Sequence, residues 1–481
     1  MGCNPNCALL TVATIGAVLA VLGGILIPVG NHFIDKTVKK EVVIENGTIA
    51  YENWVLPGSP VYREIWVFDV QNPEDVMQNG SAPILKQKGP YTYRMRYIPK
   101  GNITDHKDGT LSYLQPNIFM FQPDMSVGPE NDTFTTVNLA VVAAPALYKN
   151  RFMQYLMNIW MRSAKSRFLQ TRTVKEILWG YEDPFLKKIP IIKMDKVVGI
   201  FYPSNKTFGG PYKIYSGKDD INKKGIIITY NNSRNLKYWT SYCNMVNGTD
   251  GTAFHPFVKK SEELYLFSSD VCRSTYVLFD RDVTMKEIPL YRFSAPASAL
   301  ASSLTNPDNI CFCTERVVSR NCTTDGVLDI SSCKQGKPVY VSLPHFLYGS
   351  QMIFQFVKGM EPNVEEHTTF LEVEPVSDCK FYVVGLSFGG RKIRREKILP
   401  LPPSIHRYSA LKNIKHYFYF PVLWLNETAT ISDKKAEFFR SKVTNKIKLL
   451  NLVQLMLMIA GSVMFLGFLF AFFMCKGKNP K

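Results

Sequence analysis

The organisation of this chain is decided by one apolar run near its end, LLNLVQLMLMIAGSVMFLGFLFAFFMC at Leu449–Cys475. The run has no charged residue over 27 positions, and Lys448 and Lys476 bracket it. Because a helix rises about 1.5 Å per residue, this run is longer than the bilayer core of about 30 Å requires. A buried helix of a soluble protein rarely stays uncharged for so long, so the run is predicted to be a transmembrane helix.

A second uncharged run, Ala8–Gly30, lies near the start of the chain, and its 23 residues are also enough to cross a bilayer. The alternative is a cleaved signal peptide. That alternative is disfavoured because Met1–Cys7 has no Lys or Arg, and because the run exceeds the usual apolar length of about 7–15 residues. We therefore expect an uncleaved signal anchor.

Glycosylation sequons give the orientation of the chain. Lysines follow the first run, precede the second run and also follow the second run. The distribution of positive charge therefore does not decide the orientation of the chain. Nine sequons all lie between the runs, which predicts a glycosylated ectodomain at 31–448, a cytosolic stub at 1–7 and a cytosolic tail at 476–481. The sequons are at Asn46, Asn79, Asn102, Asn131, Asn205, Asn231, Asn247, Asn321 and Asn426.

Three cysteines, Cys3, Cys7 and Cys475, lie beside the spans on the expected cytosolic side. Such cysteines are candidates for reversible palmitoylation, and the alternative is an unmodified thiol.

Seven further cysteines lie in the expected ectodomain, where an oxidising compartment favours disulfides. Six of them allow fifteen connectivities, which spacing alone does not distinguish, and Cys379 is then left over. A zinc site is disfavoured because no His lies near Cys311 and Cys313 and no Cys-X-X-Cys pair exists. The seven are Cys243, Cys272, Cys311, Cys313, Cys322, Cys333 and Cys379.

The ectodomain sequence is rich in strand patterns. Apolar residues alternate along Val61–Val70, and similar segments occur at Tyr91–Tyr97, Gly225–Tyr230 and Val339–Leu343. Turn-forming pairs that contain Gly, Pro or Asn separate these segments. The pattern predicts a large antiparallel sheet or barrel.

One stretch, Ala146–Leu178, has helical periodicity instead and predicts an amphipathic helix pair. Arg162, Lys165 and Arg167 stand between its apolar groups. One interpretation is a helix that faces the core and has a solvated basic face. The other is an exposed apolar surface ringed by cations, which would bind lipids with anionic head groups.

The net charge of +17 comes from 57 Lys and Arg against 40 Asp and Glu. Such a charge can bind nucleic acid through phosphates, but the sequons place it outside the cell, which excludes that partner. Charged residues at 20% and aromatic residues at 13% also exclude a disordered chain.

An enzyme is not predicted. Gly385–Gly389 matches the G-x-S-x-G nucleophile elbow, which needs an acid and a His on later, separate strands. Glu396, His406 and His416 follow too closely for that arrangement. We therefore expect no catalytic residue, no metal and no cofactor.

Seven motifs together resemble the class B scavenger receptor family, across nearly the whole chain and both spans. Within that family the resemblance is strongest to the fatty-acid translocase branch, from Met1–Cys7 and Gly23–Leu26, and the tail lacks the acidic dileucine signal of the lysosomal branch. The motifs are YREIWVFDVQNP at Tyr62–Pro73, GPYTYR at Gly89–Arg94, LWGYEDP at Leu178–Pro184, NPDNICFC at Asn306–Cys313, GVLDI at Gly326–Ile330, LPHFLY at Leu343–Tyr348 and PVLWLNE at Pro421–Glu427.

The resemblance implies a mainly β fold, an antiparallel β-barrel-like ectodomain with a helical apex and an internal lipid tunnel. Ligands of such a receptor dock at the apex, here Phe152, Arg162, Lys165 and Arg167. One lysine of the family's apical pair is kept as Lys165, whereas Ser163 replaces the other. The resemblance further implies phosphorylation at Thr92 and the disulfides Cys243–Cys311, Cys272–Cys333 and Cys313–Cys322.

The implied function is a cell-surface receptor that binds long-chain fatty acids, oxidised phospholipids and modified lipoproteins such as oxidised low-density lipoprotein, and that aids fatty-acid uptake. The implied location is the plasma membrane, including lipid rafts, with transit through the Golgi and endosomes. The alternative is a matrix adhesion receptor for thrombospondin or collagen. The family's thrombospondin-binding stretch falls near Tyr93–Tyr113, where acidic residues are few.

The segment Ser377–Ser409 departs from the strands expected of the family. From Ser377 to Phe420 there are nine basic and two acidic residues, so this part supplies +7 of the net charge. An alternative exon or an error in the gene model would explain the departure.

Overall fold

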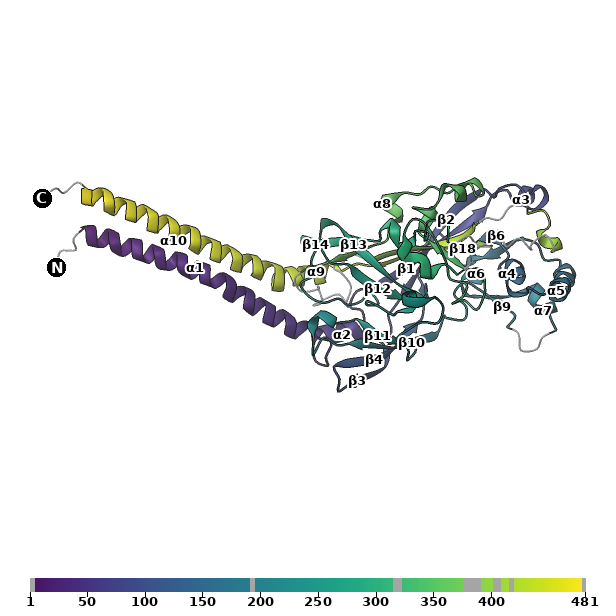
Figure 1. Ribbon diagram of the computed structural model, residues 1–481, viewed down its shortest axis with the longest axis horizontal. Helices are drawn as coiled ribbons and strands as arrows, with labels where there is room; N and C mark the ends of the chain where they lie inside the picture. The colour runs from purple at the N-terminus through teal and green to yellow at the C-terminus, as the bar shows by residue number, and fades with distance from the viewer. Residues whose placement is uncertain are drawn as a thin grey trace. The chain divides into compact units, whose positions relative to one another are not determined.

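The computed structural model describes residues 5–190, 195–314, 322–375, 391–400, 408–414 and 419–477 (Figure 1). The chain forms two compact units. Unit 1 comprises Met1–Val42, Lys286–Ile288 and Ser432–Lys481, and unit 2 comprises Val43–Met285 and Pro289–Ile431.

Unit 1 is built on two long helices, α1 (Pro5–Val42) and α10 (Asn445–Gly477), which run side by side (Figure 1). Both are long and apolar enough to cross a membrane, and the runs at Ala8–Gly30 and Leu449–Cys475 lie within them. A short helix α9 (Asp433–Phe439) and a π-helical turn (Arg440–Thr444) lead into α10.

Small residues let α1 and α10 approach closely in antiparallel orientation. Gly16 faces Gly461, and Gly23 faces Met458, so the contacts run in opposite directions along the two helices. Gln454 is buried, and its Nε2 donates a hydrogen bond to the Leu26 carbonyl at 2.8 Å. In hydrocarbon, where no hydrophobic force joins helices, close packing and polar contacts of this kind hold them together.

Gly23→Leu is expected to weaken the helix pair, because a Cβ at this position would lie 2.9 Å from the Met458 backbone nitrogen. The neighbouring Gly24→Leu is the matched control, since a Cβ there would meet nothing within 4 Å. We expect the melting temperature of the detergent-purified protein to fall by several degrees for Gly23→Leu only. Equal melting temperatures for the two variants would contradict the packing.

Unit 2 contains one large sheet of eleven strands with the order β12-β13-β14-β17-β18-β19-β1-β2-β5, to which β15 and β16 are attached through β18. The strands are β1 (Val61–Val70), β2 (Leu85–Met95), β5 (Met120–Phe121), β12 (Leu264–Ser268), β13 (Arg273–Met285), β14 (Ile288–Ser294), β15 (Val327–Asp329), β16 (Tyr340–Ser342), β17 (Phe370–Val373), β18 (Arg391–Pro400) and β19 (Tyr419–Ala429).

A second sheet has the order β11-β10-β4-β3, and two short pairs, β6–β7 and β8–β9, complete the named strands. Their bounds are β3 (Gly101–His106), β4 (Thr110–Asn117), β6 (Thr133–Val137), β7 (Leu169–Thr173), β8 (Tyr181–Glu182), β9 (Val197–Val198), β10 (Thr207–Tyr215) and β11 (Ile227–Tyr230). The antiparallel, strand-rich unit 2 agrees with the sequence pattern, whereas barrel closure, a lipid tunnel and an extracellular position stay predictions.

The helices of unit 2 are short, and α4, α5 and α7 gather together (Figure 1). The α-helices are α2 (Ile49–Val55), α3 (Pro73–Asn79), α4 (Leu139–Leu147), α5 (Arg151–Ser163), α6 (Val174–Trp179), α7 (Pro184–Lys188) and α8 (Val364–His367). The 3-10 turns are Pro123–Met125, Ile221–Lys223, Ser241–Asn244, Ala297–Leu300, Pro307–Phe312, Pro344–Phe346, Gln351–Gln355 and Ser409–Leu411.

The predicted strand at Val61–Val70 coincides with β1, and its alternating exposure follows the alternating sequence. The prediction of an amphipathic helix pair over Ala146–Leu178 is only partly correct. It holds α5 and α6, but the strand β7 stands between them and pairs with β6. The physical reason is the β-branched run at Thr171 and Thr173, which favours an extended backbone.

The sequence left the fold of the segment Ser377–Ser409 open, and its residues Arg391–Pro400 form the strand β18 inside the large sheet. This strand pairs with β19 from Ile393 to Pro400. Cys379 and the Gly385–Gly389 motif lie outside the described residues.

The core of the large sheet contains a set of stacked rings. The indoles of Trp66 on β1 and Trp424 on β19 stack with centroids 3.9 Å apart. The side-chain oxygen of Gln87, Oε1, accepts hydrogen bonds from the Trp424 indole N–H and from His345 Nε2, each at 2.7 Å. The imidazoles of His345 and His367 stack at 4.5 Å.

Hydrogen bonding fixes His345 in its neutral form. Its Nδ1 accepts the Glu361 backbone N–H at 3.1 Å, so a proton there would break this contact. Burial is the largest cause that lowers the pKa of His345 to about 4, and the neighbouring His367 is the next, while Glu366 opposes the shift.

The stability of unit 2 is therefore expected to fall as the pH drops from about 6.5 to about 4. The unfolded imidazole binds its proton near pH 6.5, whereas the folded one resists until about pH 4, so acid favours unfolding by on the order of 3 kcal/mol. Thermal unfolding between pH 7.5 and 4 measures the slope. His345→Gln should flatten it, and an unchanged slope would count against this assignment.

Candidate functional site

The helix α5 presents an apolar stripe to solvent. Its first turn is fixed by Asn150, whose Oδ1 accepts the backbone N–H of Phe152 at 2.8 Å. Phe152, Tyr155 and Ile159 are 66%, 64% and 42% exposed. At 100° per residue these three side chains share one side of the helix. This side of α5 agrees with the second interpretation of the sequence, an exposed apolar surface, and the opposite side agrees with the first, a helix that faces the core.

The opposite side of α5 faces the core through Gln154, Met157 and Met161, all buried. Gln154 donates to the Tyr148 carbonyl at 3.1 Å. Sequence periodicity missed this side because methionine and glutamine gave a weaker apolar signal than the aromatic residues outside.

Five cations lie at the two ends of α5, Lys149 and Arg151 before or at its start, and Arg162, Lys165 and Arg167 at or after its end. All five are exposed, and among the residues that the structure describes none of them is in an ion pair. No acidic residue occurs between Thr133 and Lys175. These cations, with Phe152, Tyr155 and Ile159, are called the α5 surface below.

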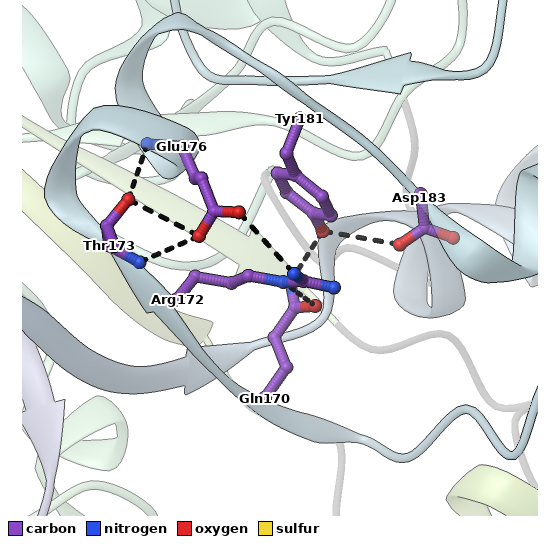
Figure 2. A network of polar contacts seen from close by, with 6 residues as sticks. All are labelled: Gln170, Arg172, Thr173, Glu176, Tyr181 and Asp183. Atoms are coloured by element: carbon purple, nitrogen blue, oxygen red, sulfur yellow. Dashed lines mark hydrogen bonds and ion pairs between the residues drawn. The ribbon is translucent and has the colours of Figure 1, made fainter. Parts of the chain in front are cut away.

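A polar network organises the segment that follows the α5 surface (Figure 2). Thr173 and Glu176 form a reciprocal capping box that begins α6. Arg172 lies 4.3 Å over the Tyr181 ring and 3.6 Å from Glu176. This arrangement fixes the chain between β7 and β8.

The network continues to α7, which contacts α5. The Tyr181 hydroxyl accepts from Gln170 Nε2 at 2.7 Å and donates to Asp183 at 3.3 Å (Figure 2). The buried Asp183 accepts the backbone N–H groups of Phe185 and Leu186, which begin α7. Burial raises the pKa of Asp183 despite these hydrogen bonds.

A second contact holds α5 from the C-terminal part of the chain. The Asn158 side-chain oxygen accepts from the Ser409 backbone N–H at 2.9 Å and from its hydroxyl at 3.0 Å. Tyr408 and Leu411 on either side are completely buried. The α5 surface is therefore carried on a fixed helix.

A separate cavity of about 80 Å³ lies inside unit 2, and sequence reasoning did not find it. Its lining residues are dispersed along the sequence, so no local motif marks them. They are Arg63, Met95, Arg96, Tyr113, Gln115, Pro116, Asn117, Tyr212, Asp250, Phe267, Ser268, Ser269, Asp270 and Glu427.

The charges around this cavity are mostly paired. Arg63 forms ion pairs with Glu427 and, at 3.5 Å, with Asp270. Burial alone would raise the pKa of Asp250, but Lys100 and Arg96 hold it below its ordinary value. Burial lowers the pKa of Lys100 to about 8.

Two polar atoms of the lining residues lack partners. Arg96 Nη1 and Gln115 Oε1 are buried without a hydrogen bond. A buried donor or acceptor left in this way is costly, so the cavity favours a polar group or water that would satisfy them.

The structure pairs Cys243 with Cys311, Cys272 with Cys333, and Cys313 with Cys322, which are the pairs that the resemblance implies. Among the described residues, no cluster of His, Cys, Asp or Glu could hold a metal ion.

Most sequons are accessible. Asn46, Asn79, Asn102, Asn131, Asn231 and Asn247 are exposed. Asn205 is partly exposed, and Asn321 lies outside the described residues. Asn426 is 3% exposed and donates its amide to Glu64, so a glycan there requires this nitrogen to leave its partner.

The other expected modification sites are Thr92 and the three cysteines beside the apolar runs. Thr92 is completely buried, and its hydroxyl donates to the Met125 carbonyl at 2.7 Å, so a kinase reaches it only if β2 opens. Cys7 lies in α1 and Cys475 in α10, while Cys3 lies outside the described residues. Palmitoylation stays a prediction.

Comparison with known proteins gives long matches. The CD36 family matches residues 14–472. Lysosome membrane protein 2 of Rattus norvegicus is 32% identical over 98% of this chain and 96% of its own length. Scavenger receptor class B member 1 of the same species is 32% identical over 76% of this chain and 72% of its own. The Cricetulus griseus form of the latter is 28% identical over 94% and 87%. These matches and the two apolar helices together indicate a two-pass membrane protein.

Asp183→Ala is expected to destabilise unit 2 by about 2 kcal/mol, because it removes the cap of α7 and the acceptor of the Tyr181 hydroxyl. Asp195→Ala is the control, since Asp195 accepts the Val197 N–H at an exposed position and should cost under about 0.5 kcal/mol. Denaturant unfolding of both variants tests this, and similar losses would place Asp183 outside the supporting network.

Proposed function

This chain belongs to the CD36 family, and on that premise we propose that it is a membrane receptor that binds lipids, long-chain fatty acids in particular, and aids their uptake. The observation that carries the proposal is the α5 surface, where five cations without ion-pair partners in the described chain lie at the two ends of a helix with exposed apolar side chains. Such a surface complements molecules that combine an anionic head with an apolar body.

The first step of the proposal is capture. A fatty-acid carboxylate or a phospholipid phosphate would pair with Lys165 and with the guanidinium groups of Arg162 and Arg167. Because these side chains are exposed, their attraction is screened by salt and affects mainly the rate of association. Oxidised phospholipids and oxidised low-density lipoprotein present the same head-group chemistry.

The second step is retention inside unit 2. The cavity beside Arg96 and Gln115 has room for a polar head group but not for a long acyl chain, so the chain would extend into a tunnel between the sheets. A carboxylate oxygen placed there would accept from Arg96 Nη1, which otherwise has no partner. Each buried CH₂ group adds about 0.8 kcal/mol, so longer chains bind more tightly.

The proposed location is the plasma membrane, with the ectodomain outside. Its support is the set of nine sequons between the two spans, which is typical of a segment exposed to the secretory pathway. One similar protein is named as a lysosomal membrane protein, so surface labelling of intact cells is the deciding measurement. We propose no catalytic activity.

Fatty-acid binding by the full-length protein in nanodiscs tests both steps. We expect affinity to rise with acyl length across a series of saturated acids. Replacing Arg162, Lys165 and Arg167 by Gln should slow association several-fold, mainly at low salt. Arg96→Gln should instead weaken equilibrium binding by about tenfold, through faster dissociation.

The matched control replaces Arg234 and Lys237, two exposed cations elsewhere in unit 2, by Gln. This variant should bind like the wild type. A flat chain-length series, or full affinity in the Arg96 variant, would contradict an interior site. Thrombospondin or collagen binding that survives delipidation and all these substitutions would favour the adhesion receptor instead.

A further inference from the structure

We propose that the stacked imidazoles of His345 and His367 form an acid-sensitive switch, which holds the segment Glu361–Asn363 on unit 2 and releases it when either ring takes up a proton. These two residues are called the histidine pair below. The inference goes beyond the proposed function, because it concerns regulation by acid and requires no lipid.

Both rings of the histidine pair hold this segment through the same kind of contact. His345 Nδ1 accepts the backbone N–H of Glu361 at 3.1 Å, and His367 Nδ1 accepts that of Asn363 at 3.0 Å. An imidazole nitrogen that accepts a hydrogen bond has no proton of its own, so protonation of Nδ1 removes the acceptor. One proton on either ring therefore breaks a backbone contact of the segment.

The surroundings of the histidine pair oppose a positive charge. His345 and His367 are 6% and 4% exposed, and their rings stack with centroids 4.5 Å apart. Three of their neighbours on the large sheet are uncharged, namely Phe68 of β1, Gln87 of β2 and Trp424 of β19. A charge in such a place is costly, and a second charge on the stacked ring would repel the first. Uptake of a proton therefore favours the released segment.

Charged groups near the histidine pair do not reverse this preference. Burial first and His367 second lower the pKa of His345 to about 4, although Glu366 of α8 opposes the shift. Glu365 of the same helix is paired with Arg281 of β13 at 3.9 Å. Other charged residues on adjoining strands and loops are Lys86 and Lys88 of β2, Lys358 and Glu361 before α8, Glu372 of β17 and Glu396 of β18.

The segment is free to leave while both of its ends stay attached. The residues Glu361–Glu366 are all exposed. Before them, the Lys358 N–H donates to the Pro83 carbonyl at 2.9 Å, and after them the Thr369 carbonyl accepts from the Ala295 N–H at 2.9 Å. Acid therefore opens the residues between these two attachments and not the whole sheet.

The backbone of the turn that contains His345 favours release. His345, Phe346 and Tyr348 have φ values of 52°, 54° and 63°, in a region that residues other than glycine seldom occupy. Such conformations persist only where their surroundings fix them, and the contact with Glu361 is one of the restraints. Loss of this contact removes a restraint from a strained turn.

Hydrogen–deuterium exchange of the full-length protein in nanodiscs, measured from about pH 7.4 to about pH 5, tests the switch. Rates are corrected for the intrinsic pH dependence of amide exchange. The released imidazole binds its proton near pH 6.5 and the held one near pH 4, so acid raises the opening constant by about 25-fold over this range. We expect this rise at the amides of Glu361 and Asn363. A flat profile in the wild-type protein would overturn the inference.

Low concentrations of urea distinguish local release from global unfolding. A local opening exposes little surface, so urea should leave the opening of the segment unchanged and increase that of β1. The segment should also exchange well before β1 at every pH. Equal protection and equal urea dependence of the two would overturn local release.

The discriminating variant is His345→Asn. Its side-chain oxygen can accept the Glu361 N–H without titrating, and asparagine tolerates a positive φ. The Glu361 amide should then lose the factor of about 25. The matched control is His255→Asn, at a histidine that pairs with Glu262 at 3.0 Å, and it should keep the full rise. A full rise in His345→Asn would assign the acid dependence to other groups and overturn the inference. The wild-type profile and its urea dependence decide the question even if this variant does not fold.

Discussion

Unit 2 depends on the antiparallel pairing of its first long strand with its last. β1 and β19 align from Val61 opposite Ala429 to Val67 opposite Leu423. Within this pairing Arg63 forms a buried ion pair with Glu427, and Trp66 stacks on Trp424. Replacing Glu427 would leave the buried Arg63 with its longer ion pair to Asp270, at a cost of up to about 3–5 kcal/mol. Strands β2 and β18 extend the sheet on the two sides of this pair, so the sheet is assembled around it.

The two candidate sites differ in chemistry because they differ in solvent access. On the α5 surface the charges are hydrated, so they attract an anionic ligand from a distance but bind it only weakly. Around the cavity Arg63 and Glu427 are buried, and among the lining residues Arg96 Nη1 and Gln115 Oε1 are buried without a hydrogen bond. An exposed site suits capture of a ligand, and an interior site suits retention of one molecule.

How much could be predicted depended on how local each signal is. The uncharged apolar runs predict the two spans, and the alternation of apolar residues predicts β1. Each of these signals lies within one continuous stretch, so the sequence alone revealed them. The helical period of α5 was also visible, but a period does not say which stripe faces the core, so the exposure of Phe152 could not be known. The strand β7 interrupts a helical pattern because its β-branched residues favour an extended backbone and because β6, more than thirty residues earlier, pairs with it. The cavity joins residues from Arg63 to Glu427, which only the fold brings together.

The β1–β19 pairing also sets the order of events during synthesis. Arg63 and Glu427 are 364 residues apart. At a translation rate of about 5–20 residues per second, β1 therefore waits roughly 20 to 70 s before its partner leaves the ribosome. During that interval the strand has an open edge, which chaperones of the secretory pathway must cover. A chain cut short before β19 would lack this partner, so premature termination before Tyr419 would disrupt the large sheet of unit 2 as well as remove the second apolar helix.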